Sequence, residues 1–297
     1  MQRIIPSLAA LIWSLMTLTA FAQESAPPAE HPSKAAWEAA GAAMQRGPST
    51  VTLRDQGSLQ LPDGYAFIPV KEATRVMESM GNQVDGRFIG LIVPLADAPW
   101  FVTVDYEESG YIKDDDAKNW DAKELLDNLK EGTEAGNERR TSMGIPPLEV
   151  TRWIESPTYD GTSQRLVWSI EARNKGVDDP DPTINYNTYL LGREGYFSLD
   201  LVTTAATVTT DKLAARELLA ATTFNDGKRY TDFNASTDKV AAYGLAALVG
   251  GLAAKKLGLI AVLGAFLLKF AKVIFLVVAG GAAAFAKFFK RDKSSEA

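Results

Sequence analysis

The chain has 297 residues, of which 46% are hydrophobic and 23% charged, so it can form a sizeable core. Its net charge of −6 is unevenly distributed: residues 239–297 hold nine Lys and Arg against two acidic residues, a net +7, so the remainder carries −13. A nucleic-acid-binding protein places basic charge on its folded surface, and this distribution excludes that class. It is typical of an acidic domain followed by a basic, apolar segment at an anionic membrane.

The chain has no cysteine, and its one histidine is His31. Disulfide bonds, thiol nucleophiles and cysteine-ligated metals are therefore excluded. His31 lies in AQESAPPAEHPSKAA, a stretch rich in Pro, Ala and Glu that is typical of a solvated linker. Ser-His-Asp triads, histidine-ligated zinc and histidine general bases are not expected either. We expect no cofactor and no metal site, and the sequence favours a protein that is not an enzyme.

The N-terminus predicts export. Residues 1–22 begin with a basic Arg3, continue with an apolar run and end in AFA, a small-x-small cleavage signal. The apolar run is shorter than the roughly 20 residues that a bilayer span requires, so a cleaved signal peptide is favoured over an uncleaved anchor. We expect a Pro/Ala-rich linker over residues 23–47 and an exported α+β domain over residues 48–230.

The exported domain begins with strand and turn signals. The tripeptide PDG at 62–64 separates two apolar runs and predicts a turn between strands. Apolar residues at helical spacing predict a helix over 70–80, which Gly81 ends. Two strands follow, and the second has one apolar and one mixed face. The apolar face carries Trp100, Val102, Val104 and Tyr106, and the mixed face carries Phe101, Thr103, Asp105 and Glu107.

A second helix is expected after Trp120. Asp121 can cap it, and Glu124 three residues later completes a capping box. Three strands are expected next, at 148–156, 164–174 and 184–192, and the middle one carries Leu166, Trp168, Ile170 and Ala172 on one face. A further strand bears Phe197, Leu199 and Leu201. A closing helix presents Leu213, Ala214, Leu218 and Ala221. The buried stripe of the second helix is predicted to be Leu125, Leu126 and Leu129.

Consecutive strands joined by short turns indicate an antiparallel sheet rather than a doubly wound parallel one. The predicted fold class is α+β, a mainly antiparallel sheet with helices packed on one face, followed by a C-terminal transmembrane helix. We expect a juxtamembrane helical segment over residues 231–256, a transmembrane anchor over 257–286 and a basic cytoplasmic tail over 287–297.

The most conspicuous polar stretch is YIKDDDAKNWDAKELL. Its three consecutive carboxylates, Asp114, Asp115 and Asp116, lack the alternating ligands, mid-loop glycine and distal glutamate of a calcium loop. A solvated acidic loop before a helix N-terminus, where negative charge is favourable, is the preferred interpretation. These three residues and Trp120 are the candidate partner-facing positions, because a tryptophan in such a loop can be exposed for a partner.

Four blocks of the sequence carry a family resemblance: LPDGYAFIP, WFVTVDYEESGYIKDDDAKNWDAKELL, NYNTYLLGREGYFSLDLV and the apolar, lysine-dotted C-terminus. Over roughly residues 48–290 the chain resembles an uncharacterised family of membrane-anchored bacterial proteins, domain of unknown function 2167. The resemblance implies a signal peptide, an exported domain and a C-terminal anchor in Gram-negative bacteria. It implies no activity and no functional residue.

The C-terminal apolar segment carries its lysines on one face. At 100° per residue, small and basic side chains share an arc of about 100°, as a helix–helix contact inside lipid requires. Lysines that snorkel to headgroups, an interfacial amphipathic helix, and a hairpin turning at 255–256 stay open as alternatives. The predicted membrane and helix-packing residues are Lys255, Gly258, Ala265, Lys269, Lys272, Gly280, Ala283 and Lys287.

These features together predict a main domain in the periplasm, held at the inner membrane of a Gram-negative bacterium. We expect a non-catalytic module that binds a protein partner in the envelope or senses envelope state, with the lipid bilayer as the partner of its C-terminal helix. One alternative is an envelope hydrolase without His and Cys. Another is a membrane-active protein that forms a homo-oligomer through the Lys/Gly/Ala face of that helix.

Overall fold

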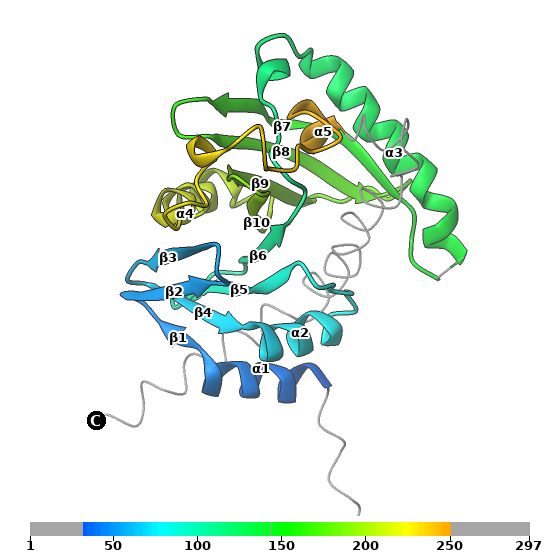
Figure 1. The fold of residues 1–297 in the computed structure, drawn as a ribbon. Coiled ribbons are helices and arrows are strands. Elements are labelled where there is room, and N and C mark those ends of the chain that lie inside the picture. Colours follow the sequence, from blue (N-terminus) through cyan, green and yellow to red (C-terminus); the bar gives the residue numbers. More distant parts are fainter. Residues whose placement is uncertain (1–31, 143, 251–297) are drawn as a thin grey trace, which may run out of the picture. The chain divides into compact units, whose positions relative to one another are not determined.

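The computed structural model describes residues 32–142 and 144–250 (Figure 1). These residues form an eight-stranded antiparallel sheet, a three-stranded sheet and helices on both sides of the larger sheet. The helices are α1 Pro32–Ala43, α2 Val70–Ser79, α3 Ala122–Ser142, α4 Val208–Ala221 and α5 Ala246–Gly250, with 3-10 turns at Asp115–Lys118 and Tyr230–Asp232.

The large sheet has the strand order β1-β4-β5-β6-β10-β9-β8-β7, and the small sheet has the order β11-β3-β2. Every neighbouring pair is antiparallel, as the short connections predicted. The strands are β1 Gln45–Arg46, β2 Ser49–Leu53, β3 Gly57–Leu61, β4 Tyr65–Pro69, β5 Phe88–Pro94, β6 Phe101–Glu107, β7 Leu148–Asp160, β8 Arg165–Asn174, β9 Thr183–Leu191, β10 Tyr196–Thr204 and β11 Thr222–Phe224.

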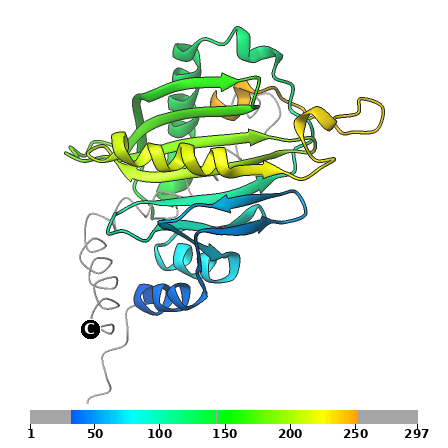
Figure 2. The ribbon, with the colours of Figure 1, turned by 90° about the vertical axis from the view of Figure 1, so that its left-hand side faces the viewer.

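One face of the large sheet packs against α4 and the small sheet. Val102 of β6 and Leu199 of β10 are buried in one cluster with Leu218 of α4 and Leu59 of β3. Figure 2 shows α4 lying along the strands on this side. The predicted apolar faces of β6 and β10 are therefore confirmed, since both point into this cluster.

The opposite face packs against two pairs of helices. Met77 of α2 lies in a cluster with Leu91 of β5, at the end of the sheet that α1 and α2 cover. Leu125 of α3 and Val249 of α5 lie in another cluster with Trp168 of β8, at the other end. Figure 1 shows α3 and α5 on the side of the sheet away from α4.

The prediction that helices pack on one face only is wrong, because the sheet is covered on both. All nine residues of β9 are buried. Asn185 and Asn187 alternate there with Ile184 and Tyr186, and such alternation is typical of a strand with one solvated face. The second face is polar but is not exposed.

Most predicted helix details hold. Asp121 Oδ1 accepts the backbone N–H groups of Lys123 (2.7 Å) and Glu124 (3.2 Å), which confirms the cap of α3. Leu125 and Leu129 are buried along α3 as expected. The closing helix differs at Leu213, which is 63% exposed, because the buried stripe of α4 runs one position away, through Val208, Asp211, Ala214, Ala215, Leu218 and Leu219.

Two predicted boundaries change. Residues 32–43, which the sequence placed in the linker, form α1, and its Ala36 and Ala40 are buried beside α2. Residues 233–245, expected to be helical, form turns and one bridge between Tyr111 and Val240.

Within the described ranges, no helix is long and apolar enough to cross a bilayer. The predicted signal peptide (1–22), anchor (257–286) and basic tail (287–297) lie outside those ranges, as do Lys255 and the other predicted membrane-face residues.

Candidate functional site

Six polar side chains lie together on the sheet face that α1, α2 and α3 share. We call them the polar strip: Thr103 and Asp105 of β6, Ser198 and Asp200 of β10, and Asn185 and Asn187 of β9. Asp200 is in register with Thr103 on one side and with Asn187 on the other. Val202 is on the same face of β10 as Asp200 and lies in the cluster of α1 and α2. The polar strip is therefore on the side of the sheet that α1 and α2 cover.

Five side chains of the strip are buried and Asp105 is half-buried, and the hydrogen-bonding groups of the strip are only partly satisfied. Thr103 and Asn187 have no exposed surface, and Asn185 is 3% exposed. The Oγ1 atom of Thr103 and the Oδ1 atoms of Asn185 and Asn187 have no hydrogen-bond partner. Buried polar groups without partners are rare, because each costs about 1–3 kcal/mol. The strip thus holds unused hydrogen-bonding capacity, mostly that of acceptors.

Negative charge adds to these acceptors. The Asp200 carboxylate accepts a hydrogen bond of 2.6 Å from the Ser198 hydroxyl. Burial, and after it the charge of Asp200, raises the pKa of the neighbouring Tyr189 well above its ordinary value. Asp105 lies in register with Ser198 on the adjacent strand. A cationic or N–H-bearing group is the chemical complement of such a surface.

Apolar side chains flank the strip at both ends. Leu91 of β5 pairs with Thr103, and Trp168 of β8 pairs with Asn187. Both are fully or almost fully buried, at 0% and 2% exposed, and the indole Nε1 of Trp168 also lacks a partner. An occupant of the strip therefore needs apolar surface on either side of its polar groups. This strip was not predicted from the sequence.

The predicted partner-facing acidic loop is tied into the fold. Asp114 accepts a 2.9 Å hydrogen bond from the hydroxyl of Tyr159. Asp116 accepts the backbone N–H groups of Leu245 (3.1 Å) and Ala246 (3.0 Å), at the start of α5. Asp115 is exposed. Nowhere in residues 32–142 and 144–250 do three or more His, Cys, Asp or Glu side chains gather as metal ligands would.

Trp120 is half-buried and packs against the cluster under α3 rather than standing free on the loop. Its ring therefore contributes to the core that holds the acidic loop in place. A partner-facing role stays a prediction for this loop, with Asp115 as its most exposed carboxylate.

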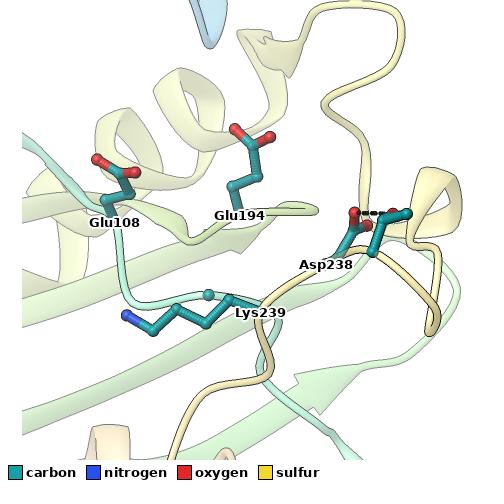
Figure 3. A pocket seen from close by; sticks show the side chains of 6 residues that line it. Glu108, Glu194, Asp238 and Lys239 are labelled. Carbon is teal, nitrogen blue, oxygen red and sulfur yellow. Dashed lines mark hydrogen bonds between the residues drawn. The ribbon is translucent and has the colours of Figure 1, made fainter.

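A small surface pocket of about 230 Å³ lies near the β9–β10 turn. It is lined by Glu108, Gly110, Glu194, Thr237, Asp238 and Lys239 (Figure 3). Arg193 donates to both oxygens of Asp238, at 2.7 and 2.8 Å, and holds the pKa of that carboxyl well below its usual range. The Lys228 ammonium lies 2.6 Å from Glu194.

The pocket is smaller than the roughly 300–1,000 Å³ typical of ligand sites. Its chain segments are joined by backbone bonds, since Tyr111 N–H donates to the Lys239 carbonyl (2.8 Å) and Gly110 N–H to the Glu194 carbonyl (2.9 Å). The ion pairs and backbone hydrogen bonds at this pocket therefore attach residues 237–241 to the sheet.

The fold and the strip define an α+β domain built on an open antiparallel sheet with a buried polar surface. The chain belongs to the family described as "Protein of unknown function (DUF2167)", whose model matches residues 45–280. A comparison with curated proteins finds no match.

Three solved structures are distantly similar. The solution structure of cyanobacterial PsbP (CyanoP) from Synechocystis sp. PCC 6803 has 15% sequence identity over 62% of this chain and 94% of that one, with a TM-score of 0.38. LpqN of Mycobacterium tuberculosis, involved in cell envelope biogenesis, has 16% identity over 61% of this chain and 91% of that one, with a TM-score of 0.29. The protein of unknown function PA94 from Pseudomonas aeruginosa has 9% identity over 57% of this chain and 91% of that one, with a TM-score of 0.21. At such TM-scores the likeness supports no conclusion about function.

Proposed function

We propose that the chain is a non-catalytic binding module of a Gram-negative envelope. In this proposal, residues 1–22 direct export, the described domain lies in the periplasm, and residues 257–286 connect it to the inner membrane. The signal-like N-terminus, the acidic body and the basic, apolar C-terminus support the location.

The observation that carries the binding role is the polar strip. Its acceptor oxygens are fixed by strand register, buried, and unmatched by donors at Thr103, Asn185 and Asn187. Fixed acceptors between apolar flanks recognise a cationic group on an apolar support. The surface pocket favours binding over catalysis as well, because its carboxylates Glu194 and Asp238 are engaged in ion pairs.

Location is tested by a reporter fused after Phe233. We expect enzymatic activity from a reporter that folds only outside the cytoplasm, and none from one that requires the cytoplasm. The reverse pattern would contradict the proposed topology.

Binding at the strip is tested by photo-crosslinking in native envelopes. A photoreactive residue replaces Thr204, which is half-buried at the end of β10 on the strip's face. The control position is Leu213, which is 63% exposed on α4, across the sheet. Adducts specific to position 204 are expected. Absence of any adduct there, within the chain or to another protein, would refute the binding role.

A further inference from the structure

The loop after the 3-10 turn at Tyr230–Asp232 carries a motif that the proposed binding role does not use. Asn234, Ala235 and Ser236 form the tripeptide Asn-X-Ser, in which X is not proline. This tripeptide is the acceptor motif for N-linked glycans in exported proteins. The chain has nine asparagines, and Asn234 alone is followed two residues later by Ser or Thr. The motif therefore singles out one position for modification.

The structure places this motif at the surface. Residues 234–237 are all exposed. Figure 2 shows the gold loop that contains them projecting past the ends of the strands. A glycan is bulky and hydrophilic, so its acceptor has to lie on an exposed loop. Asn234 meets this requirement.

Two anchors hold the loop on either side of the motif. Before it, the ring of Phe233 stacks on Tyr111, with centroids 3.8 Å apart and 15° between the planes. After it, the Asp238 carboxylate accepts hydrogen bonds from Arg193, at 2.7 and 2.8 Å, and from the Asn234 backbone N–H at 2.7 Å. The four exposed residues thus project between fixed ends, so the folded domain presents the motif to an enzyme.

The side chains of Asn234 and Ser236 already lie in contact. The Ser236 hydroxyl donates to Asn234 Oδ1 at 2.6 Å, and the Ser236 backbone N–H donates to the same oxygen at 3.0 Å. This is an Asx turn, which forms from the local sequence. Nothing in the described residues accepts a hydrogen bond from Asn234 Nδ2. The amide oxygen is therefore held by the loop while the nitrogen is left for reaction.

The hydroxyl at this oxygen bears on the reactivity of the amide. An amide nitrogen is a poor nucleophile, because its lone pair is delocalised into the carbonyl group. A hydroxyl that donates to Oδ1 stabilises the anion formed when Nδ2 loses a proton, since a hydrogen bond to a charged form favours that form. The contact between Ser236 and Asn234 supplies this donor, in agreement with the need of the motif for Ser or Thr at its third position.

We propose that Asn234 is the attachment site of an N-linked glycan. The donor is an oligosaccharide carried on a polyprenyl diphosphate, and the enzyme is a membrane-bound transferase of the envelope. A bond forms between Nδ2 and the anomeric carbon of the first sugar, and the bond from that carbon to the diphosphate oxygen breaks. The diphosphate leaves with the electron pair, and one Nδ2 proton passes to a base of the transferase. This inference rests on the proposed export, because donor and transferase act on the periplasmic side.

The test uses the full mature chain purified from its native envelope. Trypsin cuts after Arg229 and Lys239 and releases the peptide 230–239, which contains the motif. We expect this peptide to exceed its sequence mass by whole saccharide units, and electron-transfer fragmentation to place the added mass on Asn234. A peptide found only at its sequence mass, or added mass on Ser236 or Thr237, would overturn the inference.

Single substitutions separate the motif from its surroundings. Asn234→Gln and Ser236→Ala should each abolish the added mass, whereas Ser236→Thr keeps the hydroxyl and should retain it. Ala235→Pro leaves both motif side chains in place and should also abolish the added mass. Thr237→Ala is the matched control, because it removes a hydroxyl one residue further along the same exposed loop and should leave the modified fraction unchanged. Melting temperatures report whether each variant folds, and equal modification of Ser236→Ala and Ser236→Thr would contradict the role of the hydroxyl.

The proposed function fails separately. A reporter after Phe233 that is active only in the cytoplasm would refute the location, and this inference with it. A periplasmic reporter together with an unmodified peptide would overturn the glycan site and leave the location intact. Absence of adducts from position 204 would refute the binding role of the polar strip, whatever the mass of the peptide that contains Asn234.

Discussion

Asn137 on α3 takes the place of a further strand beside the edge strand β7. Its Nδ2 donates to the Leu148 carbonyl (2.9 Å), and its Oδ1 accepts the Leu148 N–H (2.8 Å). The side chain is 6% exposed. Asn137→Asp keeps the shape and the accepting oxygen, but it turns a second oxygen toward the Leu148 carbonyl. One buried carbonyl loses its donor and a buried charge appears beside it, so we expect a loss of about 3 kcal/mol at pH 7.

Urea unfolding measures this change, and thermal unfolding should show a melting temperature lower by roughly 6–12 °C. The new carboxyl can restore the bond only when protonated, so its folded pKa lies above the unfolded value of about 3.9. The deficit should therefore shrink as the pH falls toward about 4. Asn128→Asp is the control on the same helix. The Nδ2 of Asn128 is also buried but has no partner, so no hydrogen bond is lost and we expect a smaller destabilisation than at Asn137. Equal losses at the two positions would refute the reasoning.

Three further changes test other contacts. Gly110→Ala should destabilise the domain more than Gly144→Ala, since both have positive φ (91° and 70°) but only the Cβ at 110 meets backbone, 2.7 Å from a carbonyl oxygen; equal melting temperatures would contradict this. Asp116→Ala should lower the free energy of unfolding by about 1 kcal/mol and speed proteolysis near residue 245, whereas Asp115→Ala should change both little. A larger loss for Asp115→Ala than for Asp116→Ala in urea unfolding would argue against the cap. Burial raises the pKa of Tyr65 to about 12, so its contribution to stability is complete below about pH 10 and is lost toward pH 12. Over that pH range, the free energy of unfolding of Tyr65→Phe, measured in urea, should rise relative to that of the parent chain. A difference between the two chains that does not change with pH would exclude this assignment.

Local pattern was sufficient to predict several parts of the fold. The apolar face of β6, the cap of α3 and its leucine stripe depend on residues a few positions apart, and strand and helix periodicity report such spacing directly. The antiparallel pairing followed from short connections. These features needed no knowledge of distant contacts.

The covering of the sheet depended on distant contacts and was predicted only in part. The alternation of Asn with apolar residues in 184–190 indicates which side chains share a face, but it does not tell whether that face meets water or other side chains. The acidic triplet shows the same limit. Asp116 caps backbone groups 129 and 130 residues further along the chain, so the local sequence predicted only a solvated acidic loop and could not indicate this cap.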